Sequence, residues 1–159
     1  KGLKTLYRRL NTAFHGWIAP RTYRLTLREL EETTLRLDGY TVIAKRMNHF
    51  TPALGYRLQE RGRSVAYSGD TDACPEIVEL GRNADLLILE CSMPDARKVA
   101  GHLTPTECGR IAHDAACRHL VLTHFSPPAL RGLPQAAQAV RRAYHGRLTM
   151  SRDLQSFAL

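Results

Sequence analysis

The sequence predicts a layered fold of the α/β (α+β) class for these 159 residues. Three observations predict it: a helical stretch opens the chain, hairpin-forming strands follow it, and the second half alternates buried strands with helices. Apolar residues make up 43% of the chain, which suits one hydrophobic core, and the sequence shows no repeat or linker. We therefore expect one structural unit over residues 1–159.

The first half is predicted to form one helix and a set of strands. Residues 2–14 place Leu3, Leu6, Leu10 and Phe14 on one face at helical spacing. Strand-like alternation then recurs at residues 21–27, at residues 38–49 after an Asp-Gly turn, and at residues 54–70, which form a hairpin around Glu60-Arg61-Gly62.

The second half reads as strands and helices in alternation. Pro75 opens a short helix, and Thr104 with Glu107 forms a capping box that opens a longer one. The predicted elements are helices at residues 75–82, 104–117 and 134–146, buried strands at 84–90 and 119–124, and a last strand at 147–153.

Charge is distributed unevenly along the chain. The net charge is +8, but residues 1–36 hold eight Lys or Arg and three Glu, whereas residues 70–95 hold seven acids and one Arg. This pattern suits a cation site reached by an anionic substrate, and a solvated basic surface is the simpler alternative.

The sequence also indicates where the protein resides. No apolar run approaches the roughly 18 residues of a membrane span, and no signal-peptide pattern opens the chain. The four cysteines form no C-x-x-C pair and are interpreted as reduced thiols. We therefore expect a cytoplasmic protein with no membrane partner.

Polar residues collect where predicted strands end. Asp70, Glu90 and His124 each follow or close a strand, and His49 follows another. Each alone has a structural interpretation, as a turn, cap or core residue. In layered α/β folds, however, such strand ends form the crevice where ligands bind, so together they favour a site.

The residue types indicate metal-assisted hydrolysis. Asp70 and His124 are suitable ligands for a divalent transition metal such as zinc. Glu90 and His102 suit a carboxylate–histidine pair, in which the acid orients the ring and the ring protonates a leaving group. Metal ions would supply the activated water. Gly69 should allow the sharp turn that presents Asp70, and Asp72 should cap the approach to the helix at Pro75.

Five ordered segments resemble the metallo-β-lactamase-fold hydrolases, in the branch of ribonuclease Z and the arylsulfatase-like enzymes. They are "NHFTPALGYRL", "YSGDT", "ADLLILECS", "GHLTPTECGRIA" and "LVLTHFSP". The resemblance implies a metallo-β-lactamase-like αββα sandwich and a centre of two divalent metal ions, usually zinc.

The resemblance also implies residue roles. Asp70 matches the family's bridging carboxylate, and His124 matches its last metal-binding histidine. Glu90 and His102 match the pair that assists leaving-group protonation in ribonuclease Z. His49, together with Ser126 beside His124, is a candidate for substrate contact.

Two departures from the family pattern shape the expectation. The motif His-x-His-x-Asp-His and a further histidine ligand are absent, and the opening "KGLKTLYRRL" resembles a segment from the middle of these enzymes. We therefore expect residues 1–159 to be the C-terminal half of a metallo-β-lactamase-like domain. Alone, this half should retain little metal, be inactive, expose one sheet face, and pair with its missing half or with itself as a homo-oligomer.

The second departure concerns the substrate. Bacterial ribonuclease Z carries a tRNA-gripping arm between its Gly-Tyr-Arg segment and its Gly-Asp-Thr turn, but here only "LQERGRSVAYS" separates Arg57 from Gly69. This favours a small anionic ester, as in a phosphodiesterase or arylsulfatase-like esterase. One alternative is an RNA endonuclease of the ribonuclease Z type, with RNA held by Arg8, Arg9, Arg21, Arg24 and Arg28. Another is a non-catalytic binding or scaffold remnant of the fold.

Overall fold

The computed structural model describes residues 2–159, which form two compact units divided between Glu31 and Glu32. The first unit is built on helix α1 (Leu3–Ala13), as predicted. Its first turn is capped by the carboxylate of Glu29, which accepts hydrogen bonds of 3.0 Å from the backbone N–H groups of Gly2 and Lys4. Both bonds lower the pKa of the Glu29 carboxyl group, and the bond from Lys4 has the larger effect.

One predicted strand in this unit is wrong. Residues 21–27 have no regular secondary structure, although their apolar and polar residues alternate. A strand needs a neighbour to pair its backbone N–H and C=O groups, and within residues 2–31 of the first unit the structure describes no strand that could pair with this segment. The alternation of apolar and polar residues, taken alone, therefore predicted a strand wrongly.

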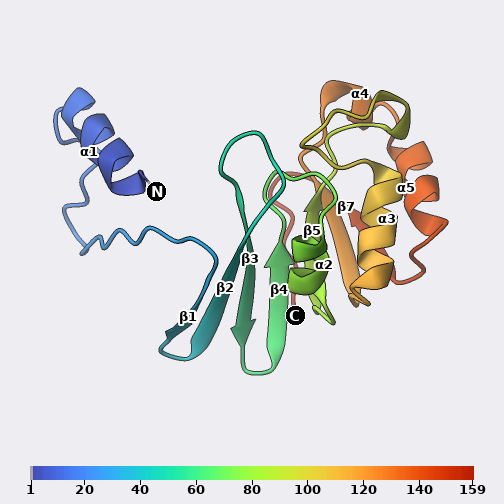
Figure 1. The fold of residues 1–159 in the computed structure, drawn as a ribbon, viewed down its shortest axis with the longest axis horizontal. Coiled ribbons are helices and arrows are strands. Elements are labelled where there is room, and N and C mark those ends of the chain that lie inside the picture. The colour runs from blue at the N-terminus through green and yellow to red at the C-terminus, as the bar shows by residue number, and fades with distance from the viewer. Residues whose placement is uncertain (1) are drawn as a thin grey trace. The chain divides into compact units, whose positions relative to one another are not determined.

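The second unit contains one seven-stranded sheet whose strands lie side by side in chain order (Figure 1). The strands are β1 (Thr33–Leu37), β2 (Tyr40–Arg46), β3 (Leu54–Glu60), β4 (Arg63–Tyr67), β5 (Leu86–Glu90), β6 (His119–Thr123) and β7 (Arg147–Met150). Neighbouring strands are antiparallel from β1 to β4 and parallel from β4 to β7.

Strand β1 was not predicted, although its sequence carries a signal. Leu35 and Leu37 alternate with Thr34 and Arg36, and Asp38-Gly39 then closes a two-residue hairpin to β2. An Asp-Gly pair in a two-residue turn favours a hairpin of two antiparallel strands. The hairpin between β3 and β4, in contrast, turns at Arg61-Gly62 as expected.

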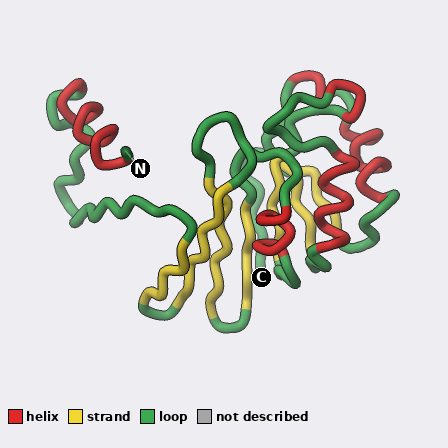
Figure 2. The backbone as a smooth tube through the Cα atoms, in the orientation of Figure 1, coloured by secondary structure: helices red, strands yellow, loops and turns green. Residues whose placement is uncertain are grey.

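Along the chain, helices connect the parallel strands; Figure 2 draws these helices in red and the strands in yellow. Helix α3 has the predicted capping box, with both reciprocal bonds between Thr104 and Glu107. The last long helix ends at Arg141, five residues earlier than expected, and the chain then turns so that Tyr144 is buried. The helices are α2 (Pro75–Gly81), α3 (Pro105–Asp114), the short and unpredicted α4 (Pro127–Leu130) and α5 (Leu133–Arg141).

The hydrophobic core lies between these helices and one face of the sheet. Leu87 and Leu89 on β5 and Leu120 and Leu122 on β6 are fully buried there. Each such side chain contributes about 1.5–3 kcal/mol relative to exposure. This core holds β5 and β6 rigid, and both strands end at the candidate site.

The opposite face of the sheet is exposed in places. Tyr56, Leu58 and Tyr67 on β3 and β4 expose between 36% and 41% of their surface. Their registers place Tyr56 beside Tyr67 and Leu58 beside Val65, so these side chains share one face. The expected exposure of one sheet face is found only there, because Leu86 and Val121, on the same face of the neighbouring strands β5 and β6, are buried.

Candidate metal and acid–base site

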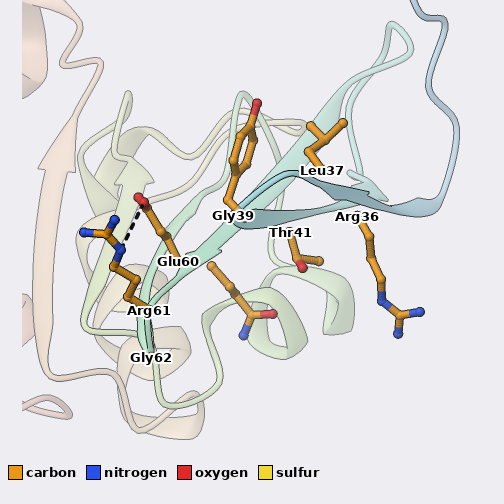
Figure 3. Close-up of a pocket in the computed structure, with 9 residues that line it drawn as sticks. Arg36, Leu37, Gly39, Thr41, Glu60, Arg61 and Gly62 are labelled. Atoms are coloured by element: carbon orange, nitrogen blue, oxygen red, sulfur yellow. Dashed lines mark ion pairs between the residues drawn. The ribbon is translucent and has the colours of Figure 1, made fainter.

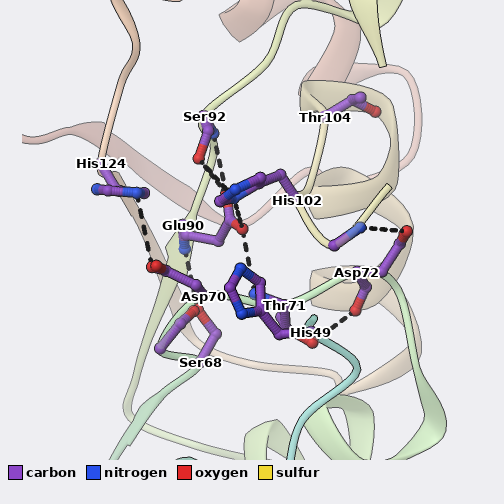
Figure 4. A network of polar contacts seen from close by, with 12 residues as sticks. His49, Ser68, Asp70, Thr71, Asp72, Glu90, Ser92, His102, Thr104 and His124 are labelled. Atoms are coloured by element: carbon purple, nitrogen blue, oxygen red, sulfur yellow. Dashed lines mark hydrogen bonds and ion pairs between the residues drawn. The ribbon is translucent and has the colours of Figure 1, made fainter. Parts of the chain in front are cut away.

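Four strands end at one edge of the sheet. β2 and β4 run in the same direction because both are antiparallel to β3, and β4, β5 and β6 are parallel. Their C-terminal ends therefore meet. As predicted, this arrangement brings His49, Asp70, Glu90 and His124 together, and His102 joins them from the loop before α3 (Figure 4).

Asp70 stands on a sharp turn after β4. Gly69 has a φ of 60°, and a Cβ atom there would lie 2.9 Å from the carbonyl oxygen of Leu54. Only glycine fits this position without strain or displacement of the backbone. The expectation that Gly69 allows the turn is confirmed.

Asp70 and His124 face each other at the rim. The Nε2 atom of His124 lies 3.6 Å from Oδ1 of Asp70, and the side chains are 52% and 41% exposed. His124 adopts a φ of 59°, in the left-handed region that residues other than glycine uncommonly occupy. The backbone thus holds an imidazole and a carboxylate toward the same open space.

This pair has the chemistry of a metal site but not its full ligand set. Carboxylate oxygen and neutral imidazole nitrogen are ordinary zinc donors. Among residues 2–159, however, no group of three His, Cys, Asp or Glu side chains is arranged to hold an ion. Asp70 and His124 therefore fit as part of a donor set, and two donors do not hold a tight site.

Glu90 is fully buried and completely hydrogen-bonded. Its Oε1 accepts from the backbone N–H of Thr71 at 3.1 Å and lies 2.8 Å from Nδ1 of His102. Its Oε2 accepts from the backbone N–H and the hydroxyl of Ser92, at 3.0 and 2.6 Å. These donors offset the cost of burying a carboxylate.

The contact with Glu90 orients the ring of His102. Because the carboxylate accepts, Nδ1 of His102 carries a proton, and Nε2 is left to face the rim. Ser92 also lies 3.2 Å from Nδ1 and so supports the same orientation. Ser92 was not identified from the sequence, although its position two residues after Glu90 was a local signal.

His49 and Ser126 occupy different surroundings. The ring centroid of His49 lies 5.3 Å from that of His102, which in turn lies 6.1 Å from that of His124. Ser126 is the N-cap of α4, where its hydroxyl accepts from the N–H of Ala129 at 3.4 Å. His49 is therefore part of the histidine cluster, whereas Ser126 already has a structural contact.

Asp72 bears out its expected role in part, because its Oδ1 accepts from the backbone N–H of Ala73 at 2.8 Å on the approach to α2. The N-cap of α2 itself is Cys74, which makes no side-chain capping bond. Asp72 also bonds to Lys98 and to the backbone N–H of Gly101, two residues of the segment that carries His102. Sequence spacing gave no sign of this contact, since the partners lie 26 and 29 residues away.

A hollow elsewhere on the unit contains none of these residues. It measures about 490 Å³ and lies at the β1–β2 and β3–β4 turns, at the opposite ends of the strands (Figure 3). Arg61 there makes a 3.9 Å ion pair with Glu60. This exposed surface gives no support to the predicted chemistry, which depends on the other end of the sheet.

Comparison with known proteins defines the class. A family model described as the beta-lactamase superfamily domain matches residues 3–125, and the chain belongs to the metallo-β-lactamase superfamily. Within it the chain is related to ribonuclease Z: the Streptomyces coelicolor protein is 30% identical over 185 residues, covering 83% of this chain and 61% of that protein.

Solved structures agree with this assignment. The metallo-β-lactamase fold protein YhfI from Bacillus subtilis aligns with a TM-score of 0.69 at 24% identity, over 76% of this chain and 50% of that one. Human tRNase Z, short form, aligns with a TM-score of 0.60 at 28% identity, over 78% and 45%. The predicted fold is thus confirmed.

The lengths differ between this chain and its relatives. Residues 1–159 span between 34% and 61% of the length of the first curated relatives they match. In the described chain, no helix combines the length and apolar character needed to cross a bilayer.

Proposed function

We propose that residues 1–159 form the C-terminal half of a metal-dependent hydrolase that cleaves small anionic esters, as a phosphodiesterase or an arylsulfatase-like esterase does. One observation carries this proposal. The buried Glu90–His102 pair lies beside the exposed Asp70–His124 pair at a single edge of the sheet. Structural histidines have no need of this juxtaposition, whereas hydrolysis needs both a metal site and a proton donor.

Asp70 and His124 would hold metal, with zinc favoured by their donor types. The remaining donors would come from a His-x-His-x-Asp-His segment outside residues 1–159. When bound, two such ions supply Lewis acidity and an activated water. The contribution of this chain is to hold Asp70 on a rigid turn and His124 in a fixed left-handed conformation.

His102 would protonate the leaving oxygen from Nε2. Glu90 holds the Nδ1 proton and stabilises the charged ring, so the ring faces the substrate in one orientation. His49, whose ring lies against that of His102, would contact the departing group. Ser126 would offer its hydroxyl proton to the substrate while its oxygen caps α4.

The dependence of rate on the leaving group tests this role. His102→Ala in the polypeptide that the gene encodes should lower kcat on an alkyl phosphodiester by about 10²–10⁴-fold, because a poor leaving group needs a proton. The loss should be far smaller on bis(p-nitrophenyl) phosphate, whose leaving group departs unprotonated. His113→Ala, which alters an exposed histidine on α3, serves as the control.

Equal losses on both substrates would contradict the assignment of His102 as proton donor. No metal-dependent hydrolysis by the unaltered polypeptide would instead favour a scaffold role for the fold.

RNA is a second candidate substrate, favoured by the similarity to ribonuclease Z. Five arginines of the first unit are exposed and could contact phosphates: Arg8, Arg9, Arg21, Arg24 and Arg28. The short β3–β4 hairpin has no inserted arm. Such RNA binding would weaken steeply with salt. The logarithm of the binding constant should fall with the logarithm of the salt concentration, with a slope of about −0.7 per phosphate contact on a single strand. Binding that is absent or insensitive to salt would exclude this use of the arginines.

A further inference from the structure

The segment that carries His102 has little regular structure of its own. Between β5 and α3 the chain forms only a single short 3₁₀ turn at Asp95–Arg97, and residues 98–104 are irregular. We call residues 98–103 the His102 loop. Irregular backbone does not fix a side chain unless other groups hold it.

The ammonium group of Lys98 is fully engaged in holding this loop. It lies 2.6 Å from Oδ1 of Asp72, 2.7 Å from the backbone carbonyl oxygen of His102, and 2.6 and 2.7 Å from the two carboxylate oxygens of Glu107. An ammonium has three protons, and here three groups receive them. Lys98 thereby joins His102, the first turn of α3 and the turn after Asp70.

Asp72 completes the connection from the other side. Its Oδ2 accepts from the backbone N–H of Gly101 at 3.0 Å, and its own N–H donates to the carbonyl of Asn48 at 2.7 Å. The residue stands two positions after Asp70. One carboxylate therefore ties the His102 loop to the turn that presents the candidate metal ligand.

Close packing reinforces these bonds. Gly101 has a φ of 82°, and a Cβ atom there would lie 2.9 Å from the ring of Phe50 and 3.3 Å from that of His49. The His102 loop thus lies directly against the segment that carries His49. The φ of Gly101 disfavours any other residue there, and the exposed ring of Phe50 would have to move to admit a Cβ atom.

We infer that Lys98 and Asp72 are positioning residues, which set the ring of His102 relative to Asp70 without contacting reacting atoms. The catalytic part of the inference rests on the proposed function, but the structural part does not. A lysine bonded to the backbone of a site residue and to two carboxylates has a more specific role than a surface ion pair, which seldom has much effect.

Lys98→Met tests this inference, because methionine keeps most of the side-chain length and removes the charge. Lys45→Met is the matched control: Lys45 is also 32% exposed and pairs with Glu79 of α2, but contacts no part of the His102 loop. NMR of the polypeptide that the gene encodes would follow the Nδ1 proton of His102 and the amide hydrogen exchange of Gly101.

Lys98→Met should broaden the His102 Nδ1 proton signal and accelerate Gly101 exchange by about tenfold or more, since local opening becomes easier. Lys45→Met should change neither. In the polypeptide that the gene encodes, Lys98→Met should lower kcat about tenfold with KM nearly unchanged, because a misplaced proton donor slows chemistry more than binding.

An unchanged His102 signal and unchanged Gly101 exchange in Lys98→Met would overturn the inference. If Lys98→Met does not fold, Asp72→Asn takes its place. Faster amide exchange of Gly101 in Asp72→Asn would then support the inference, and unchanged exchange would overturn it. If the NMR changes occur but the unaltered polypeptide hydrolyses no ester, the positioning role stands and the proposed function fails.

Discussion

Nδ1 of His102 lies 2.8 Å from Oε1 of Glu90, a carboxylate with no exposed surface. This contact joins a buried strand end to a residue of an irregular loop twelve positions further on. The carboxylate is tolerated in the core because four donors surround it. Its removal should therefore affect both the folded state and the ring that it orients.

Glu90→Gln should lower the free energy of unfolding by about 1–3 kcal/mol, because the amide nitrogen would face donors instead of accepting from them. Urea unfolding measures this change. Glu60→Gln, at a side chain 55% exposed, is the control and should stay within about 0.5 kcal/mol of the unaltered protein. Equal stabilities of the two variants would show that Glu90 is not held as described.

Gly69→Ala should be more destabilising than Gly62→Ala. Both glycines have positive φ, of 60° and 78°, so each substitution costs about 1–2 kcal/mol in backbone strain. A Cβ at residue 69 also meets the Leu54 carbonyl, which adds about 1–3 kcal/mol, whereas at residue 62 it meets nothing within 4 Å. Thermal unfolding of the two variants compares them, and equal melting temperatures would contradict the tight turn.

Asp85 should make stability depend on acid pH. Hydrogen bonding from the Ser64 backbone, and then the charge of Arg118, lowers the pKa of this carboxyl group below its ordinary value. The folded state therefore binds fewer protons than the unfolded state. Its stabilisation is complete above about pH 4, the unfolded pKa, and is lost as pH falls through the folded pKa.

Asp85→Asn should accordingly flatten the loss of stability below about pH 4, as followed by urea unfolding at several pH values. Asp38→Asn, at an exposed turn, should keep the slope of the unaltered protein. A slope that is the same in all three proteins would show that Asp85 contributes nothing to acid sensitivity.

Much of the fold could be predicted from local sequence. The capping box at Thr104 and the apolar runs of β5 and β6 identified their elements because each signal lies within the element itself. The failures were non-local. Residues 21–27 alternate like a strand, but the described part of the first unit holds no strand that could pair with them; α5 ends at Arg141, and Tyr144 beyond it is buried in the core.

The site shows the same limit. Strand ends predicted that Asp70, Glu90 and His124 would meet, because parallel strands bring their C-terminal ends to one edge. The role of Lys98 could not be predicted in this way. Its partners Asp72 and Glu107 lie on different elements, and only folding brings their charges to one ammonium.

Bound zinc per polypeptide, measured on the protein that the gene encodes, tests the central claim most directly. Asp70→Asn and His124→Ala should each lose most of the metal, because each removes a donor from the shared site. His113→Ala should retain it, since that side chain lies exposed on α3. Full metal content in both site variants would contradict the assignment of Asp70 and His124 as metal ligands.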